Sequence, residues 1–190
     1  PMLSTPIASA EPPEDFATGR IIFTSNSGGS AFDLYRINSE GRDFHFLTNV
    51  MGSFQSRFID GADCAPDGRS IIFAVSRIIE ISHLGANQNQ LTTADAGSFK
   101  YPAYSPNGNQ IALNGISDLT TNFEIFIANS NGTNMVRLTD NSSTDVMPRW
   151  SPDSQKIAFI LRNEEQANIV IIDADGSNST SILTLTSTFI

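Results

Sequence analysis

The chain has 190 residues, of which 39% are hydrophobic, and a formal net charge of −9. This apolar content supports one folded domain with a core and argues against wholesale disorder. The acidic balance argues against nucleic acid or an anionic membrane as the main partner, because both need a basic face. The single cysteine excludes an internal disulfide, and no apolar run is long enough to span a bilayer.

Residues 1–18 are rich in proline, serine and alanine and show no periodicity. We expect a linker or an extended arm there, either as the tether of an extracytoplasmic domain or as a frayed terminus. The chain opens at Pro1 without a signal-peptide pattern, as a mature or trimmed form would.

From residue 19 to the end the chain is organised as a repeat. Four units are expected, at about 19–48, 57–92, 101–139 and 146–186, and the first is incomplete. Gly41, Gly85, Gly132 and Gly176 mark them at spacings of 44, 47 and 44 residues. Periods of this size with several short apolar strands are typical of β-propeller blades.

Each unit is predicted to contain four strands. The first strands are expected at 57–64, 101–105 and 146–151, and the second at 21–23, 71–75, 111–113 and 157–161. The third are expected at 34–37, 78–81, 124–128 and 169–172, and the fourth at 44–48, 88–92, 135–139 and 181–184. The second and third strands are nearly continuous apolar runs, which predicts burial on both faces.

Two turns and one dipeptide recur in the units. The turn after the first strand contains Pro66-Asp67-Gly68 or its equivalent, and the turn after the third strand ends in the marker glycine. Each unit closes on a Leu-Thr pair, which comes one residue late in the last unit. The four pairs are Leu47-Thr48, Leu91-Thr92, Leu138-Thr139 and Leu183-Thr184.

These motifs resemble the WD-like repeat of TolB-type β-propellers over residues 19–186. The resemblance implies an all-β propeller of four-stranded antiparallel blades. It implies little about function, because such blades occur in periplasmic scaffolds, peptidase gating domains, lyases and surface proteins. The chain has no α/β domain ahead of the repeats, so no partner-binding residues are carried over.

Ring closure leaves three alternatives. The units can close as a small four-bladed ring, they can be part of a larger propeller, or they can form an open arc whose edges another chain covers. Residues before Gly19 contain several prolines, which disfavours a first strand there, and only six residues follow Thr184. The second and third alternatives are therefore favoured, since unpaired sheet edges are usually covered.

No catalytic, cofactor-binding or metal-binding residue is predicted. Cys64 takes the place of Tyr104 and Trp150 in other units and is expected to be a buried, packed thiol. His45 and His83 lack a serine and an acid at suitable positions. The run that begins at Asp173 resembles a calcium loop but lacks the acidic twelfth position.

Partner binding is predicted on the face that carries the long, varied loops. These loops are expected at 24–32, 114–123 and 162–168, and at 49–59, 94–100 and 140–145. Their aromatic residues either contact a partner or plug the blades. The candidate contacts are Phe54, Arg57, Phe58, Phe99, Lys100, Asp118, Leu119, Glu164 and Glu165.

Two functions are carried forward. The first is a non-catalytic interaction or scaffold propeller of the bacterial envelope, periplasmic or extracellular, as an accessory subunit of a larger complex. A protein partner is expected, including one that covers open blade edges, and no cofactor. The alternative is the propeller portion of an enzyme, a polysaccharide lyase or a serine peptidase, whose catalytic residues lie outside this chain.

Overall fold

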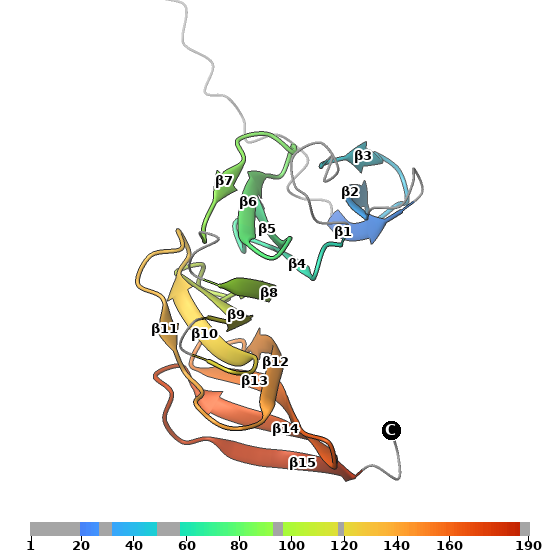
Figure 1. The fold of residues 1–190 in the computed structure, drawn as a ribbon. Coiled ribbons are helices and arrows are strands. Elements are labelled where there is room, and N and C mark those ends of the chain that lie inside the picture. The colour runs from blue at the N-terminus through green and yellow to red at the C-terminus, as the bar shows by residue number, and fades with distance from the viewer. Residues whose placement is uncertain (1–19, 27–31, 49–57, 93–96, 118–119, 187–190) are drawn as a thin grey trace, which may run out of the picture.

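The computed structural model describes residues 20–26, 32–48, 58–92, 97–117 and 120–186. All regular structure in these ranges is β, in fifteen strands that form four antiparallel sheets. Figure 1 shows the sheets following one another along an arc in chain order. The predicted all-β architecture of successive blades is therefore confirmed for the described part of the chain.

Each sheet is one blade, and its strands pair in chain order. Blade 1 contains β1 (Arg20–Ser25), β2 (Asp33–Asn38) and β3 (His45–Phe46). Blade 2 contains β4 (Ala62–Cys64), β5 (Ser70–Ala74), β6 (Ile78–Ser82) and β7 (Asn89–Gln90). Blade 3 contains β8 (Ser98–Tyr104), β9 (Gln110–Ile116), β10 (Glu124–Asn129) and β11 (Val136–Arg137). Blade 4 contains β12 (Thr144–Trp150), β13 (Lys156–Arg162), β14 (Gln166–Asp173) and β15 (Thr180–Thr186).

The first strand of each four-stranded blade differs most from the prediction. β4 begins at Ala62 instead of residue 57, whereas β8 and β12 begin before the predicted residues 101 and 146. Residues 98–100 were expected in a loop and lie in β8. The early starts of β8 and β12 were missed because each strand contains a bulge. The bulge lies at Tyr101 in β8, where φ is 51°, and at Met147 in β12, where φ is 59°. A bulge breaks the alternation by which a strand is recognised in a sequence.

The hydrophobic core consists of three apolar layers, each between two neighbouring blades. Ile71 and Phe73 of β5 face blade 1, whereas Ile72 and Ala74 of the same strand face blade 3. Alternate residues of a strand point to opposite faces, so a strand between two neighbours needs apolar residues throughout. The predicted burial of the second and third strands on both faces is confirmed in blades 2 and 3.

The threonine of the Leu-Thr pair joins the outer strand to its own blade. In blades 1 to 3 its hydroxyl accepts a hydrogen bond from the backbone N–H of the residue fourteen positions earlier. The N to Oγ1 distances are 3.0 Å for Leu34 and Thr48, 2.9 Å for Ile78 and Thr92, and 2.9 Å for Ile125 and Thr139. The repeat of this dipeptide therefore has a structural cause.

Blade 4 lacks this hydrogen bond because its Leu-Thr pair comes one residue late. Leu183 lies opposite Ile169, and the Thr184 hydroxyl donates instead to Asn168 Oδ1 at 2.6 Å. β15 is seven residues long and exposed throughout, whereas the described outer strands of the other blades have two residues each. Blade 4 therefore presents a long outer edge.

The expectation that Cys64 is buried is wrong, since its side chain is exposed. In blades 3 and 4 the large side chain at this position reaches back to the preceding blade. Tyr104 Oη donates to Glu80 of blade 2 at 3.1 Å, and Trp150 Nε1 donates to the carbonyl of Ala103 of blade 3 at 3.1 Å. A cysteine side chain is too short to make the equivalent contact.

The alternative of a closed four-bladed ring is also wrong for the described residues. Blades 1 and 4 lie at the two ends of an open arc (Figure 1). The alternatives of a larger ring and of an arc that another chain completes remain.

Candidate interaction surfaces

The blades give the molecule two distinct ends. The turn face carries the turns that follow the first and third strands of each blade, such as those at Pro66 and Gly85. The long-loop face lies at the opposite end and carries the connections between the second and third strands and between blades. The predicted partner contacts belong to the long-loop face by this topology.

Phe58 is the aromatic candidate that the structure places at the surface. Its side chain is 58% exposed, and its ring lies 5.8 Å from the ring of Phe32 in blade 1. It precedes β4, so it stands where the chain passes from blade 1 to blade 2. An exposed aromatic side chain such as that of Phe58 can anchor a protein partner.

Phe99 is a buried residue and does not lie at the surface. It is 1% exposed and packs edge-on against Phe126, with ring centroids 5.8 Å apart. The reason is its place in β8, on the side that faces blade 2. Of the two interpretations left open for such aromatics, plugging the blade is the one that fits Phe99.

Lys100 is held between blades. Its Nζ lies 3.2 Å from Asp60 Oδ2 in the segment before β4 and 5.8 Å from the ring centroid of Phe123. The ion pair with Asp60 ties blade 3 to blade 2, whereas the contact with Phe123 lies within blade 3. A partner would have to compete with both of them for the ammonium group.

Glu164 and Glu165 lie together at the rim of a hollow on the long-loop face of blade 4. The hollow has a volume of about 590 Å³ and is also lined by Arg162, Asn163, Ser142 and Thr144. Both carboxylates are exposed in the turn between β13 and β14. The remaining candidates, Phe54, Arg57, Asp118 and Leu119, lie outside the described residues.

A buried polar cluster beneath this face was missed by the sequence reasoning. Glu124 at the start of β10 accepts hydrogen bonds from the Thr139 hydroxyl at 2.5 Å and from the Asn141 N–H at 3.2 Å. Asn141 Nδ2 donates to Asp145 Oδ2 at 2.7 Å, which links the cluster of blade 3 to β12 of blade 4. Both carboxyl groups are buried, and Asp145 Oδ1 has no hydrogen-bond partner among the described residues.

Burial has the largest effect on the pKa of Asp145. It raises the pKa of this carboxyl to about 6, with a smaller contribution from the nearby charge of Glu124, against the hydrogen bond from Asn141. The only sequence signal for this cluster is the acidic residue directly before the apolar run 125–128. That signal does not show that residue 145 returns to it from the next blade.

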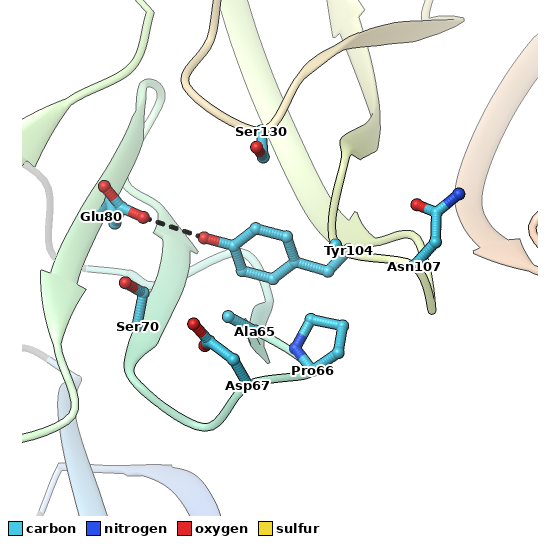
Figure 2. Close-up of a pocket in the computed structure, with 9 residues that line it drawn as sticks. Ala65, Pro66, Asp67, Ser70, Glu80, Tyr104, Asn107 and Ser130 are labelled. Carbon is cyan, nitrogen blue, oxygen red and sulfur yellow. Dashed lines mark hydrogen bonds between the residues drawn. The ribbon is translucent and has the colours of Figure 1, made fainter.

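The turn face carries a hollow of about 500 Å³ between blades 2 and 3. Figure 2 shows the Tyr104 ring lying across it toward Glu80, to which its hydroxyl is hydrogen-bonded. Burial and the charge of Glu80 raise the pKa of the Tyr104 phenol, so it stays a neutral donor. A similar hollow of about 510 Å³ lies between blades 3 and 4. Because the hollow recurs at two junctions between blades, it results from the way in which neighbouring blades pack.

The histidine and acidic side chains of the described residues do not gather into a metal-binding cluster. No group of three or more His, Cys, Asp or Glu side chains in them could hold a metal ion. His45 contacts Asp43 in blade 1, and His83 lies at the carbonyl of Arg69 in blade 2, so the two imidazoles belong to different sites. Within these ranges no helix is long and apolar enough to cross a membrane.

The model of the TolB β-propeller domain matches residues 75–189. The chain belongs to this family. A TolB homolog of Chlorobium chlorochromatii is 29% identical over 161 residues, which cover 77% of this chain and 33% of that protein. Dipeptidyl-peptidase 5 of Porphyromonas endodontalis is 34% identical over 96 residues, which cover 48% of this chain and 14% of that protein. The chain thus spans a third or less of the length of these two relatives.

A solved TolB-type structure agrees with the fold. The putative TolB of Agrobacterium tumefaciens superposes with a TM-score of 0.76 at 22% sequence identity, over 88% of this chain and 62% of that one. This likeness confirms the blade architecture of this TolB-type chain.

Proposed function

We propose that this TolB-type chain is a non-catalytic interaction propeller of the bacterial envelope, periplasmic or extracellular, which serves as an accessory subunit or scaffold. One observation carries the proposal. The long-loop face carries an exposed aromatic, Phe58, where the chain passes from blade 1 to blade 2, and on blade 4 a hollow rimmed by two exposed carboxylates, Glu164 and Glu165.

The chemistry of this face suits a protein partner. The two carboxylates favour a partner with a basic rim, while Phe58 supplies apolar contact area. Phe54, Arg57, Asp118 and Leu119 belong to loops of the same face by sequence and stay candidates. Phe99 is left out because it is buried, and Lys100 serves as a contact between blades.

A binding experiment with matched charge variants tests this proposal. The chain would be immobilised, exposed to envelope extract of its source organism, and compared with the double variant Glu164→Lys, Glu165→Lys. A partner that is captured by the wild type, lost with the double variant and retained with Glu40→Lys on the turn face is the expected result. Capture that is unchanged in the double variant would contradict the proposal.

The match to a dipeptidyl peptidase favours a second candidate, in which this chain is the propeller portion of an enzyme. The catalytic residues would then lie outside the chain. The complete reading frame of the gene distinguishes the two candidates. A hydrolase domain fused to these repeats would favour the enzyme, and a membrane anchor or an isolated propeller would favour the scaffold.

A further inference from the structure

The hollow on the turn face between blades 2 and 3 carries an unbalanced negative charge. It has a volume of about 500 Å³, and nine described residues line it. Two of them, Asp67 and Glu80, bear carboxylates, and none is lysine, arginine or histidine. Neither carboxylate forms an ion pair with a described residue. The shape of the hollow follows from blade packing, but its charge does not.

The corresponding hollow between blades 3 and 4 contains a cation that the chain itself supplies. It is lined by Lys156 and Asp173, whose side chains form an ion pair within blade 4. The hydrogen bond and charge of Asp173, together with the charge of Asp175, raise the pKa of Lys156. The carboxylates of this hollow are therefore balanced in part from within the chain.

At the junction of blades 1 and 2, Arg36 stands where Glu80 stands in the next blade. Each lies two positions after the N–H that binds the threonine of the Leu-Thr pair. The Arg36 side chain is 3% exposed, and its Nη2 lies 3.1 Å from Asp43 Oδ2. Its Nη1 donates to the carbonyl of His83 in blade 2 at 3.1 Å. A guanidinium group with a carboxylate beside it therefore fits between two neighbouring blades.

The hollow between blades 2 and 3 offers free acceptors around an aromatic ring. Glu80 Oε1 accepts from the Tyr104 hydroxyl at 3.1 Å and Asp67 Oδ1 from the Arg69 N–H at 2.9 Å. Glu80 Oε2 and Asp67 Oδ2 accept no hydrogen bond from a described residue. Figure 2 shows Glu80 at the hydroxyl end of the Tyr104 ring and Asp67 beside the ring.

The negative potential of several carboxylates converges on this ring. Besides burial, the charges of Glu80, Asp67 and Asp63 raise the pKa of the Tyr104 phenol. A cation is attracted both by carboxylates and by the face of an aromatic ring. A guanidinium suits such a site better than an ammonium, because its planar fork donates to carboxylates and stacks on aromatic rings.

We propose that the hollow between blades 2 and 3 binds a guanidinium group from outside the chain. The group belongs either to an arginine side chain of a protein or to a free guanidine compound. It donates to Glu80 and Asp67 and lies against the Tyr104 ring. The site is on the turn face and uses none of the candidate contacts of the long-loop face, so it can fail independently of the proposed function.

An NMR titration of the 190-residue chain with a capped Gly-Arg-Gly peptide tests the proposal. About 0.15 M salt screens the general attraction of a cation to an acidic chain. The backbone amide signals of Asp67, Glu80 and Tyr104 are expected to shift and saturate with a dissociation constant of about 1 mM or below. The same peptide with neutral citrulline in place of arginine should bind at least about tenfold more weakly.

Charge variants with matched hydrogen bonding identify the site. Glu80→Gln keeps an acceptor for the Tyr104 hydroxyl, and Asp67→Asn keeps one for the turn, so both should fold. Each is expected to weaken binding of the arginine peptide by about tenfold or more. Ser130→Lys supplies a cation at the lining of the hollow and should abolish binding with both carboxylates in place. Glu165→Gln, on the long-loop face, should bind like the wild type.

Ethylguanidinium separates the two sources of the guanidinium group. Binding as tight as that of the peptide would assign the hollow to a free compound, and binding at least about tenfold weaker would assign it to a protein side chain. Three results would each overturn the proposal: no saturating shift at these residues, equal binding of the citrulline peptide, or unchanged binding in both carboxylate variants.

Discussion

Gly132 of blade 3 lies directly against Leu91 of blade 2. A Cβ atom on Gly132 would stand 2.3 Å from the carbonyl oxygen of Leu91, and the residue has a φ of 83°. A Cβ atom on the equivalent Gly85 would stand 2.7 Å from the carbonyl oxygen of Leu47. The marker glycine of one blade therefore packs on the Leu-Thr pair of the blade before it, which explains why the two motifs recur together.

Substitution of this glycine should destabilise the chain much more than substitution of its counterpart in blade 1. Gly132→Ala combines a left-handed backbone with a clash against backbone atoms, and we expect it to lower the free energy of unfolding by about 3 kcal/mol or more. Gly41→Ala has a φ of 74° but no atom within 4 Å of the added Cβ, because no described blade packs on it. Its expected cost is about 1 kcal/mol. Urea denaturation measures both, and equal losses would contradict this account.

The threonine hydrogen bond predicts a difference between blades 2 and 4. Thr92→Val leaves the buried N–H of Ile78 without its acceptor, so we expect a loss of about 1–3 kcal/mol in the free energy of unfolding. Thr184→Val removes a hydroxyl that makes no such bond and lies on an exposed strand, so its effect should stay within about 0.5 kcal/mol. Thermal melting of the two variants side by side provides the comparison.

The buried carboxyl of Asp145 predicts a pH dependence. Because the pKa of Asp145 is about 6 in the folded chain and its ordinary value is 3.8, the folded state binds the proton more tightly. Its contribution to stability is complete below pH 4 and is lost as the pH rises to about 6, by at most ~3 kcal/mol. Asp145→Asn removes this loss, so the variant should gain stability over the wild type across that window and keep the gain at pH 8.

Glu165→Gln, an exposed carboxyl on the same end of the molecule, is the control for this experiment. Urea midpoints at pH 4, 5, 6 and 8 should give a constant difference between Glu165→Gln and the wild type. A constant difference for Asp145→Asn as well would show that Asp145 does not titrate in this window.

The two phenylalanines that the sequence could not tell apart should respond in opposite ways. Phe99→Ala removes a buried ring from the layer between blades 2 and 3, so we expect a loss of about 3–5 kcal/mol. Phe58→Ala should change stability by about 1 kcal/mol or less, because the side chain is mostly exposed. A larger fall in melting temperature for Phe58→Ala than for Phe99→Ala would show that the burial of the two side chains is assigned wrongly.

The sequence alone determined the blade repeat, the positions of the second and third strands, and the TolB-type family. These features are local: turn residues with restricted φ, apolar runs of strand length and a fixed spacing are all read along the chain. The glycine and Leu-Thr motifs were found for the same reason, although the contact between them was not.

The tertiary structure alone decided which side chains are buried: it corrected the expectation for Cys64 and chose between the two interpretations of Phe99. Cys64 is exposed, and Phe99 is buried because it lies in β8 on the side that faces blade 2. The contact between Asp145 and the Glu124 cluster also depends on the neighbouring blade. Burial depends on what packs against a residue, and in a repeat array that neighbour lies about forty residues away in the chain.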